Sequence, residues 1–422
     1  MTVQMTTLPN GLRVLTDRMD TVESASIGVW VGVGARHETT AVNGVSHLLE
    51  HMAFKGTRRR NARGIAEEIE NVGGHLNAWT SRENTAYFAR VLAADVPLAV
   101  DILADILQHS AFDPEELERE RTVIIQEIGQ VDDTPDDLIF DRFQEIAFPG
   151  QPLGRPVLGS EERVRGMSRD AIAGYMSDNY TAPAMVLAAA GKVDHDQLVA
   201  LAERQFGNLP KRNGPTYDPA RYQGGEKLEA RDLEQAHLVL GFEGVSYTDP
   251  DYYALMVATN ILGGGMSSRL FQEIRERRGL VYSVYAYSGS YLDGGVFGVY
   301  AGTGADSLKE LVPAVCEEIV KLGEGATDAE IARTRAQIKS GILMGLESTS
   351  ARVERLGQHS MVYGAPLPID KVVAKIEAVD SAAISRVIRR VIASAPTVSA
   401  LGPVAELERM GGIAAKFREA MR

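Results

Sequence analysis

The feature that most constrains the fold of this chain is an internal repeat. Residues 327–335 (TDAEIARTR) match residues 113–121 (DPEELERER) in a helix-capping residue, a glutamate three positions later, an aliphatic residue and two arginines at equal offsets. In each half an amphipathic helical segment precedes the match, and a strand containing Phe88 or Phe297 precedes that segment. One such match can be generic helix-start chemistry, but the shared order of elements favours a duplication.

The length of the chain leads to the same organisation. A chain of 422 residues is too long for one ordinary hydrophobic core. The repeat therefore predicts an α+β protein with two related domains, each a mainly antiparallel β-sheet covered by α-helices. The periodic pattern breaks around the turn-forming residues Lys211–Pro215 and Gly224-Gly225. We expect a linker at 213–231 between a first domain, 1–212, and a second domain, 232–422.

Charge and composition exclude several function classes. The net charge of −13 argues against nucleic acid or an anionic membrane as the main partner. We expect no membrane segment, because no apolar run approaches the length of a span, and no signal peptide, because no basic segment precedes an apolar core. The single cysteine, Cys316, excludes an intrachain disulfide. These features predict a cytoplasmic protein.

The segment that carries chemistry is His47-Leu48-Leu49-Glu50-His51. On a helix, residues four apart lie one turn apart on the same face, so both imidazoles and the carboxylate of Glu50 project toward one point. Two neutral imidazoles suit Zn²⁺, and a nearby carboxylate can take a proton from water. The pattern is the inverted form of the H-E-x-x-H zinc motif. The alternative is a helix with two unrelated histidines.

A catalytic zinc site needs a third protein ligand. Glu127 is a candidate on the helix that begins at Asp113, and Glu120 lies two turns earlier on the same face, where it can hydrogen-bond a ligand histidine. From periodicity alone, solvent-facing acids on a charged helix are the better explanation of both glutamates.

A family resemblance selects between these alternatives. Residues 44–57 (GVSHLLEHMAFKGT) closely resemble the active-site segment of the pitrilysin family of inverzincin metallopeptidases, which includes the processing peptidases. The resemblance runs from Leu8 to about Arg390, and counting from His51 to the family's third ligand leads to Glu127. It implies one zinc per chain held by His47, His51 and Glu127, with Glu50 as general base, Glu120 as an accessory acid, and a fold that forms half of a clamshell.

Two further segments resemble substrate-facing parts of this family. Residues 73–80 (GGHLNAWT) resemble an edge strand to which a substrate peptide adds, with Asn77 and Ala78 beside the scissile bond. Residues 260–270 resemble a glycine-rich loop that handles substrate. Its glycines are Gly263, Gly264 and Gly265. The alternative for the first segment is an ordinary strand after a Gly-Gly turn.

Arg275 and Tyr282 match a family pair that contacts substrate carbonyls and can stabilise an oxyanion; a solvated arginine cluster at a helix end is the alternative. The second half contains no H-x-x-E-H, and the repeat puts Gly341 where Glu127 stands. We expect that half to be a wall and substrate clamp without metal. Twelve acidic and three basic side chains lie between residues 113 and 145. They favour basic peptides if they face a chamber, but a solvated acidic face explains them equally well.

These observations predict a zinc metalloendopeptidase that cuts short or unfolded peptides. The chain matches half of the family's long single-chain members, in which the arginine and tyrosine pair lies in the last quarter. We therefore expect a homodimer in which Arg275 and Tyr282 of one protomer serve the zinc of the other. The rival hypothesis is a non-catalytic scaffold subunit, although relatives of that kind have typically lost part of the metal motif that this chain keeps.

Overall fold

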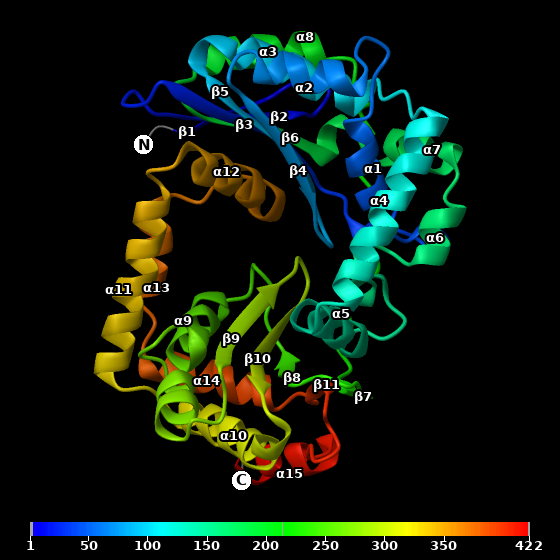
Figure 1. The fold of residues 1–422 in the computed structure, drawn as a ribbon. Coiled ribbons are helices and arrows are strands. Elements are labelled where there is room, and N and C mark those ends of the chain that lie inside the picture. The colour runs from blue at the N-terminus through cyan, green and yellow to red at the C-terminus, as the bar shows by residue number, and fades with distance from the viewer. Residues whose placement is uncertain (1–2, 213, 421–422) are drawn as a thin grey trace. The chain divides into compact units, whose positions relative to one another are not determined.

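The computed structural model describes residues 3–212 and 214–420, which form two compact units (Figure 1). The first unit comprises the residues up to Gly129, Arg155–Asp218 and Leu343–Leu367; the second comprises Gln130–Gly154, Pro219–Ile342 and the residues from Pro368 onward. One boundary, between Asp218 and Pro219, falls inside the segment that we expected to be a linker. The remaining boundaries place Gln130–Gly154, from the first half of the chain, in the second unit, and Leu343–Leu367, from the second half, in the first unit. The division at 212 and 232 stays a prediction.

The first unit is built on a six-stranded sheet with the order β1-β2-β6-β3-β5-β4. The strands are β1 (Val3–Thr7), β2 (Arg13–Arg18), β3 (Ser24–Val31), β4 (His75–Thr80), β5 (Thr85–Leu92) and β6 (Met185–Gly191). Neighbouring strands are antiparallel except for β2 and β6. Nearly all of β3 is buried because helices cover both faces of the sheet. Strand β4 lies at the edge of the sheet.

The first unit contains eight helices among its described residues, and some of them cover the two faces of the sheet. The eight helices are α1 (Val45–Ala53), α2 (Ala62–Glu70), α3 (Val96–Gln108), α4 (Pro114–Asp132), α6 (Glu161–Gly166), α7 (Arg169–Asn179), α8 (His195–Phe206) and α12 (Thr349–Tyr363). On one face, α3 packs against β3 and β5, and α1 packs against β4 (Figure 1). On the other face, α12 packs against β2, β3 and β6.

The packing of α12 depends on one glycine. A Cβ atom at Gly357 would lie 2.1 Å from the ring of Trp30, which is completely buried on β3. Only glycine lets the helix approach the indole this closely. Val353 and Leu356 of the same helix complete this second core of the first unit.

The second unit is built on a five-stranded sheet with the order β7-β11-β8-β10-β9. The strands are β7 (Gly225–Ala230), β8 (Ala236–Glu243), β9 (Ser283–Ser290), β10 (Gly295–Thr303) and β11 (Thr397–Gly402). Its helices are α5 (Pro135–Ala147), α9 (Tyr252–Gly263), α10 (Leu308–Glu324), α11 (Asp328–Gly345), α13 (Ile369–Glu377), α14 (Ser381–Ile392) and α15 (Met410–Ala420), together with a π-helix at Phe271–Arg277. Helix α5 packs on β7, β8 and β11, and α9 packs on β9.

The two sheets confirm the repeat. Strands β2-β6-β3-β5-β4 and β7-β11-β8-β10-β9 have the same order, and in each sheet the first two of these strands form a parallel pair. The matched segments both start helices: Asp113 accepts hydrogen bonds from the N–H groups of Glu115 and Glu116 before α4, while Thr327 and Glu330 bond reciprocally before α11. The protein is therefore α+β with two related parts, as the sequence predicts. In the described residues, no helix combines the length and the apolar character that crossing a membrane requires.

Candidate metal centre

Helix α1 carries the three residues of the H-x-x-E-H motif. Its N-terminus is held by the buried carboxylate of Glu38, which accepts hydrogen bonds from the N–H groups of Gly44 at 2.7 Å and Ser46 at 2.8 Å. Gly44 has φ +96°, and a Cβ there would lie 2.7 Å from the carbonyl oxygen of Leu158. The apolar side of α1 is buried in the core of the first unit, so the motif residues occupy its other side.

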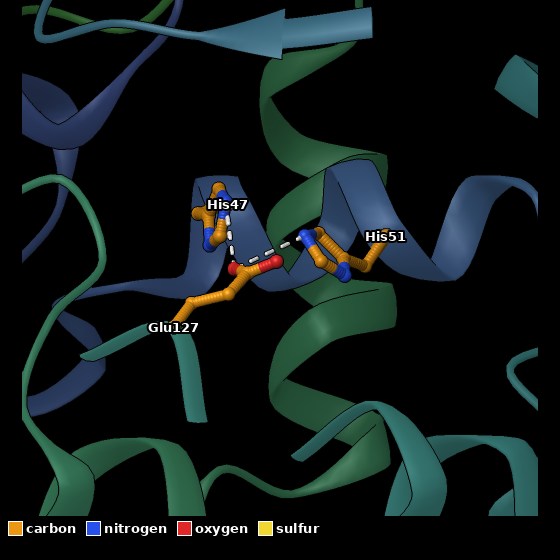
Figure 2. Close-up of side chains that lie close together, drawn as sticks. All are labelled: His47, His51 and Glu127. Atoms are coloured by element: carbon orange, nitrogen blue, oxygen red, sulfur yellow. Dashed lines mark ion pairs between the residues drawn. The ribbon is translucent and has the colours of Figure 1, made fainter. Parts of the chain in front are cut away.

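The imidazoles of His47 and His51 and the carboxylate of Glu127, from helix α4, converge on one point (Figure 2). Oε2 of Glu127 lies 3.8 Å from Nε2 of His47 and 3.7 Å from Nε2 of His51. One ligand atom from each residue lies within 4.8 Å of the other two. Tetrahedral Zn²⁺ with bonds of ~2.0–2.2 Å holds its ligand atoms about 3.3–3.6 Å apart. The two distances to Glu127 are slightly longer than this spacing, and a small approach of the carboxylate would close them around an ion. Two imidazoles and a carboxylate are also a suitable donor set for zinc.

The protonation state of His47 suits metal binding. Burial, with a smaller contribution from the neighbouring His51, lowers the pKa of His47 to about 4. The side chain is therefore neutral at pH 7, as a ligand must be. Its Nδ1 is buried and makes no hydrogen bond within the part of the chain that the structure describes.

His51, in contrast, is oriented by a chain of charged groups. Its Nδ1 lies 2.9 Å from Oε2 of Glu120, and Oε1 of Glu120 lies 2.6 Å from Nζ of Lys55. Burial alone would lower the pKa of His51, but the hydrogen bond to Glu120 and the nearby carboxylates outweigh it and raise the pKa. Burial likewise opposes ionisation of Glu120, but His51 and Lys55 keep its pKa below the ordinary value. Glu120 is thus an ionised acceptor that leaves Nε2 of His51 to face Glu127.

Glu50 lies between the two histidines in sequence and is partly buried. Burial raises its pKa, and the hydrogen bond that Thr80 donates to Oε2 over 2.6 Å partly opposes that rise. A carboxylate with a raised pKa holds a proton more readily and is a better base. The group therefore combines two neutral or neutralisable imidazoles, one carboxylate ligand and one separate carboxylate suited to proton transfer.

Comparison with known proteins identifies the family. A model described as insulinase (peptidase family M16) matches residues 13–161, and a model described as the peptidase M16 inactive domain matches residues 166–338. The chain belongs to peptidase family M16. This membership confirms the resemblance read from the sequence, and it agrees with the group of possible metal ligands in the first half of the chain.

The M16 relatives are similar over nearly the whole chain. An uncharacterized zinc protease of Streptomyces coelicolor is 40% identical over 96% of this chain and 90% of its own length. A probable mitochondrial-processing peptidase β subunit of Arabidopsis thaliana is 40% identical over 96% of this chain and 79% of its own length. Among solved structures, a protease from Helicobacter pylori has a TM-score of 0.88 at 22% identity, covering 95% of this chain and 99% of its own. A chain of complex III2 from Candida albicans gives the same TM-score and identity, covering 99% and 100%. The two solved structures support the fold.

The remaining residues singled out from the sequence lie in two places. Asn77 and Ala78 lie on β4, where Ala78 pairs with Tyr87 on one side and the other side of the strand is the sheet edge. Arg275 and Tyr282 lie in the second unit. The guanidinium of Arg275, on the π-helix, is 5.7 Å from the ring centroid of Tyr282, which is 79% exposed. The two side chains are therefore neighbours, and their role toward substrate stays a prediction.

The glycine-rich segment has a packing role that the sequence did not reveal. Gly263 ends α9, and a Cβ there would lie 2.2 Å from the backbone nitrogen of Ala286 on β9. Gly264 is the C-terminal cap of the same helix, and around Gly265 the space is open.

Three residues beside the metal group were missed from the sequence: Glu38, Lys55 and Thr80. Lys55 was detectable, since it lies one helical turn after His51. Thr80 was detectable too, since it lies on the same face of β4 as Ala78. No local pattern marks Glu38.

Proposed function

We propose that this protein is a zinc-dependent metalloendopeptidase that hydrolyses peptide bonds in short or unfolded peptides. The observation that supports this proposal best is the convergence of His47, His51 and Glu127, with Glu50 adjacent and free of the ligand cluster. His47, His51 and Glu127 would hold the ion. Several M16 relatives are named zinc proteases, among them one from Bacillus subtilis that is 37% identical over 94% of this chain.

The chain's own residues divide the chemistry between them. Zinc, when bound, would supply Lewis-acid activation of water and of the substrate carbonyl. Glu50 takes a proton from the attacking water at its carboxylate and delivers it to the leaving amine. Its raised pKa favours this exchange, because a base that binds the proton too weakly would not accept it. Glu120 and Lys55 keep His51 oriented during the reaction.

The edge strand β4 is the proposed substrate platform. A peptide in extended form can add to the free side of β4 near Asn77 and Ala78 and be held by main-chain hydrogen bonds. Gly263, Gly264 and Gly265 are the proposed second contact with substrate. A preference for basic peptides would follow from the acidic stretch between residues 113 and 145.

We further propose that the enzyme acts as a homodimer in the cytoplasm, with Arg275 and Tyr282 of one protomer stabilising the oxyanion at the other protomer's site. A mixed dimer tests this arrangement. One protomer carries Glu50→Gln, and the other carries Arg275→Ala with Tyr282→Phe. If the pair acts across the interface, the mixture contains one complete site and regains activity, whereas each homodimer is weak. No recovery on mixing, or a monomer at working concentration, contradicts the shared site.

The central test of the proposed function separates metal binding from turnover. Purified wild type and Glu50→Gln are both expected to hold about one zinc per chain, while Glu50→Gln loses nearly all cleavage of a peptide library. His47→Ala and Glu127→Ala are expected to lose the metal as well. A wild-type protein that binds zinc and cleaves nothing in the library would favour the non-catalytic scaffold hypothesis. Normal cleavage by Glu50→Gln would contradict the role of Glu50.

A further inference from the structure

The orientation of Glu50 depends on a single hydrogen bond. Oγ1 of Thr80 donates to Oε2 of Glu50 over 2.6 Å. Among the described residues no other group hydrogen-bonds to the Glu50 side chain. Oε1 therefore stays available for a proton, while Oε2 is fixed.

The position of Thr80 on its strand explains why it reaches Glu50. Side chains alternate between the two faces of a strand. On β4, Leu76 and Ala78 pack into the same core as helix α1, whereas Trp79 packs into the core under α12. Thr80 shares the face of Leu76 and Ala78, so its hydroxyl is the one polar side-chain group that β4 presents toward α1.

The strand also holds Thr80 in place. Its backbone pairs with Thr85 of β5, which is completely buried, and its β-branched side chain has few rotamers in a strand. The hydroxyl is therefore a fixed donor rather than a mobile one. The hydrogen bond of this hydroxyl joins helix α1 to the end of β4, the strand that we propose as the substrate platform.

We infer that Thr80 is a positioning residue that holds Glu50 in the orientation needed for proton transfer. This inference rests on the proposed function, because it assumes that Glu50 is the base. Hydrogen bonds to charged groups and small misplacements of a reacting group each correspond to about 10- to 100-fold in rate. The loss should appear in kcat, because the substitutions change only the side chain of Thr80, whose hydroxyl bonds to Glu50 and not to a residue of the ligand cluster.

The test compares Thr80→Val, which keeps the shape and removes the hydroxyl, with Thr80→Ser, which keeps the hydroxyl. Thr80→Val is expected to lower kcat about 10- to 100-fold with KM within about twofold of wild type. Thr80→Ser should retain most of kcat, and both variants should hold zinc as wild type does. Thr122→Val is the matched control, since among the described residues the exposed hydroxyl of Thr122 bonds only to the carbonyl of Glu118 in its own helix.

Three outcomes would overturn the inference. In the first, Thr80→Val has the kcat of wild type while Glu50→Gln is inactive, so the proposed function survives and the role of Thr80 does not. In the second, Thr80→Ser is as slow as Thr80→Val, so the hydroxyl is not the cause. In the third, Thr80→Val raises KM alone, which would assign Thr80 to peptide binding. Normal turnover by Glu50→Gln would instead remove the proposed function and this inference together.

Discussion

Replacing Glu120 with glutamine tests how the protein sets its affinity for zinc. Each oxygen of Glu120 serves one donor, His51 at 2.9 Å and Lys55 at 2.6 Å. Glutamine has one acceptor oxygen, so one donor must lose its partner. If the amide NH2 faces His51, the imidazole proton moves to Nε2, the nitrogen that faces Glu127. If the amide NH2 faces Lys55, it meets an ammonium group, and two donors cannot hydrogen-bond to each other. Glu120 is only 6% exposed, so water cannot easily replace the lost partner.

The expected cost is about 10- to 100-fold in zinc affinity, the usual effect of removing a group that orients a ligand histidine. This corresponds to about 1.4–2.7 kcal/mol. A competition titration with a chromophoric chelator at neutral pH measures it. Glu118→Gln is the control, because Glu118 is on the same helix but 69% exposed. Glu127→Ala should lower the zinc affinity more than Glu120→Gln does, and Glu118→Gln should leave the zinc affinity almost unchanged. Zinc binding by Glu120→Gln as tight as that of wild type would refute this account of His51.

Three other predictions concern packing, pH and substrate. Gly357→Ala should destabilise the protein by about 1–3 kcal/mol, because the new Cβ meets Trp30. Gly341→Ala, in open space on α11, should stabilise the protein by up to ~1 kcal/mol. Thermal melts of the two variants measure the difference. The pKa of Glu330 is lowered to about 2, chiefly by its hydrogen bonds from Arg269. The pair therefore stabilises the fold fully above about pH 4.5, and this stabilisation is lost as the pH falls toward 2. In urea unfolding, the difference in free energy of unfolding between wild type and Glu330→Gln should shrink over that window. Unfolded peptides should be cut and tightly folded domains should resist, because only extended segments can add to β4; rapid internal cleavage of a stable domain would contradict this.

Local patterns predicted the motif helix and the repeat, because both depend on residues close together in sequence. The spacing of His47 and His51 fixes a shared helix face, and the capping chemistry at Asp113 and Thr327 fixes two helix starts. Glu127 is different. Nothing in the periodicity of α4 separates a metal ligand from a solvent-facing acid, and only the family resemblance selected it.

Long-range pairings were the part that the sequence could not supply. The amphipathic pattern of α12 shows that one of its faces is buried, but not which sheet buries it. Its partner is Trp30, more than three hundred residues away, and the close approach at Gly357 is visible only in three dimensions. The same holds for α5, which comes from the first half of the chain and covers the second sheet. Burial of Glu38 under the start of α1 is a third case.

Helix α12 packs on the first sheet and α5 packs on the second, so each sheet needs a helix from the other half of the chain. This arrangement affects how the chain folds during synthesis. While the ribosome synthesises the protein, the first sheet lacks the helix that covers the Trp30 face until residues 349–363 have emerged. Until then an apolar surface of β2, β3 and β6 is open to water and to other nascent chains. The first unit therefore cannot complete the core around Trp30 until α12 has been synthesised. A gene split at the apparent midpoint would yield two fragments, each without a helix that covers its own sheet.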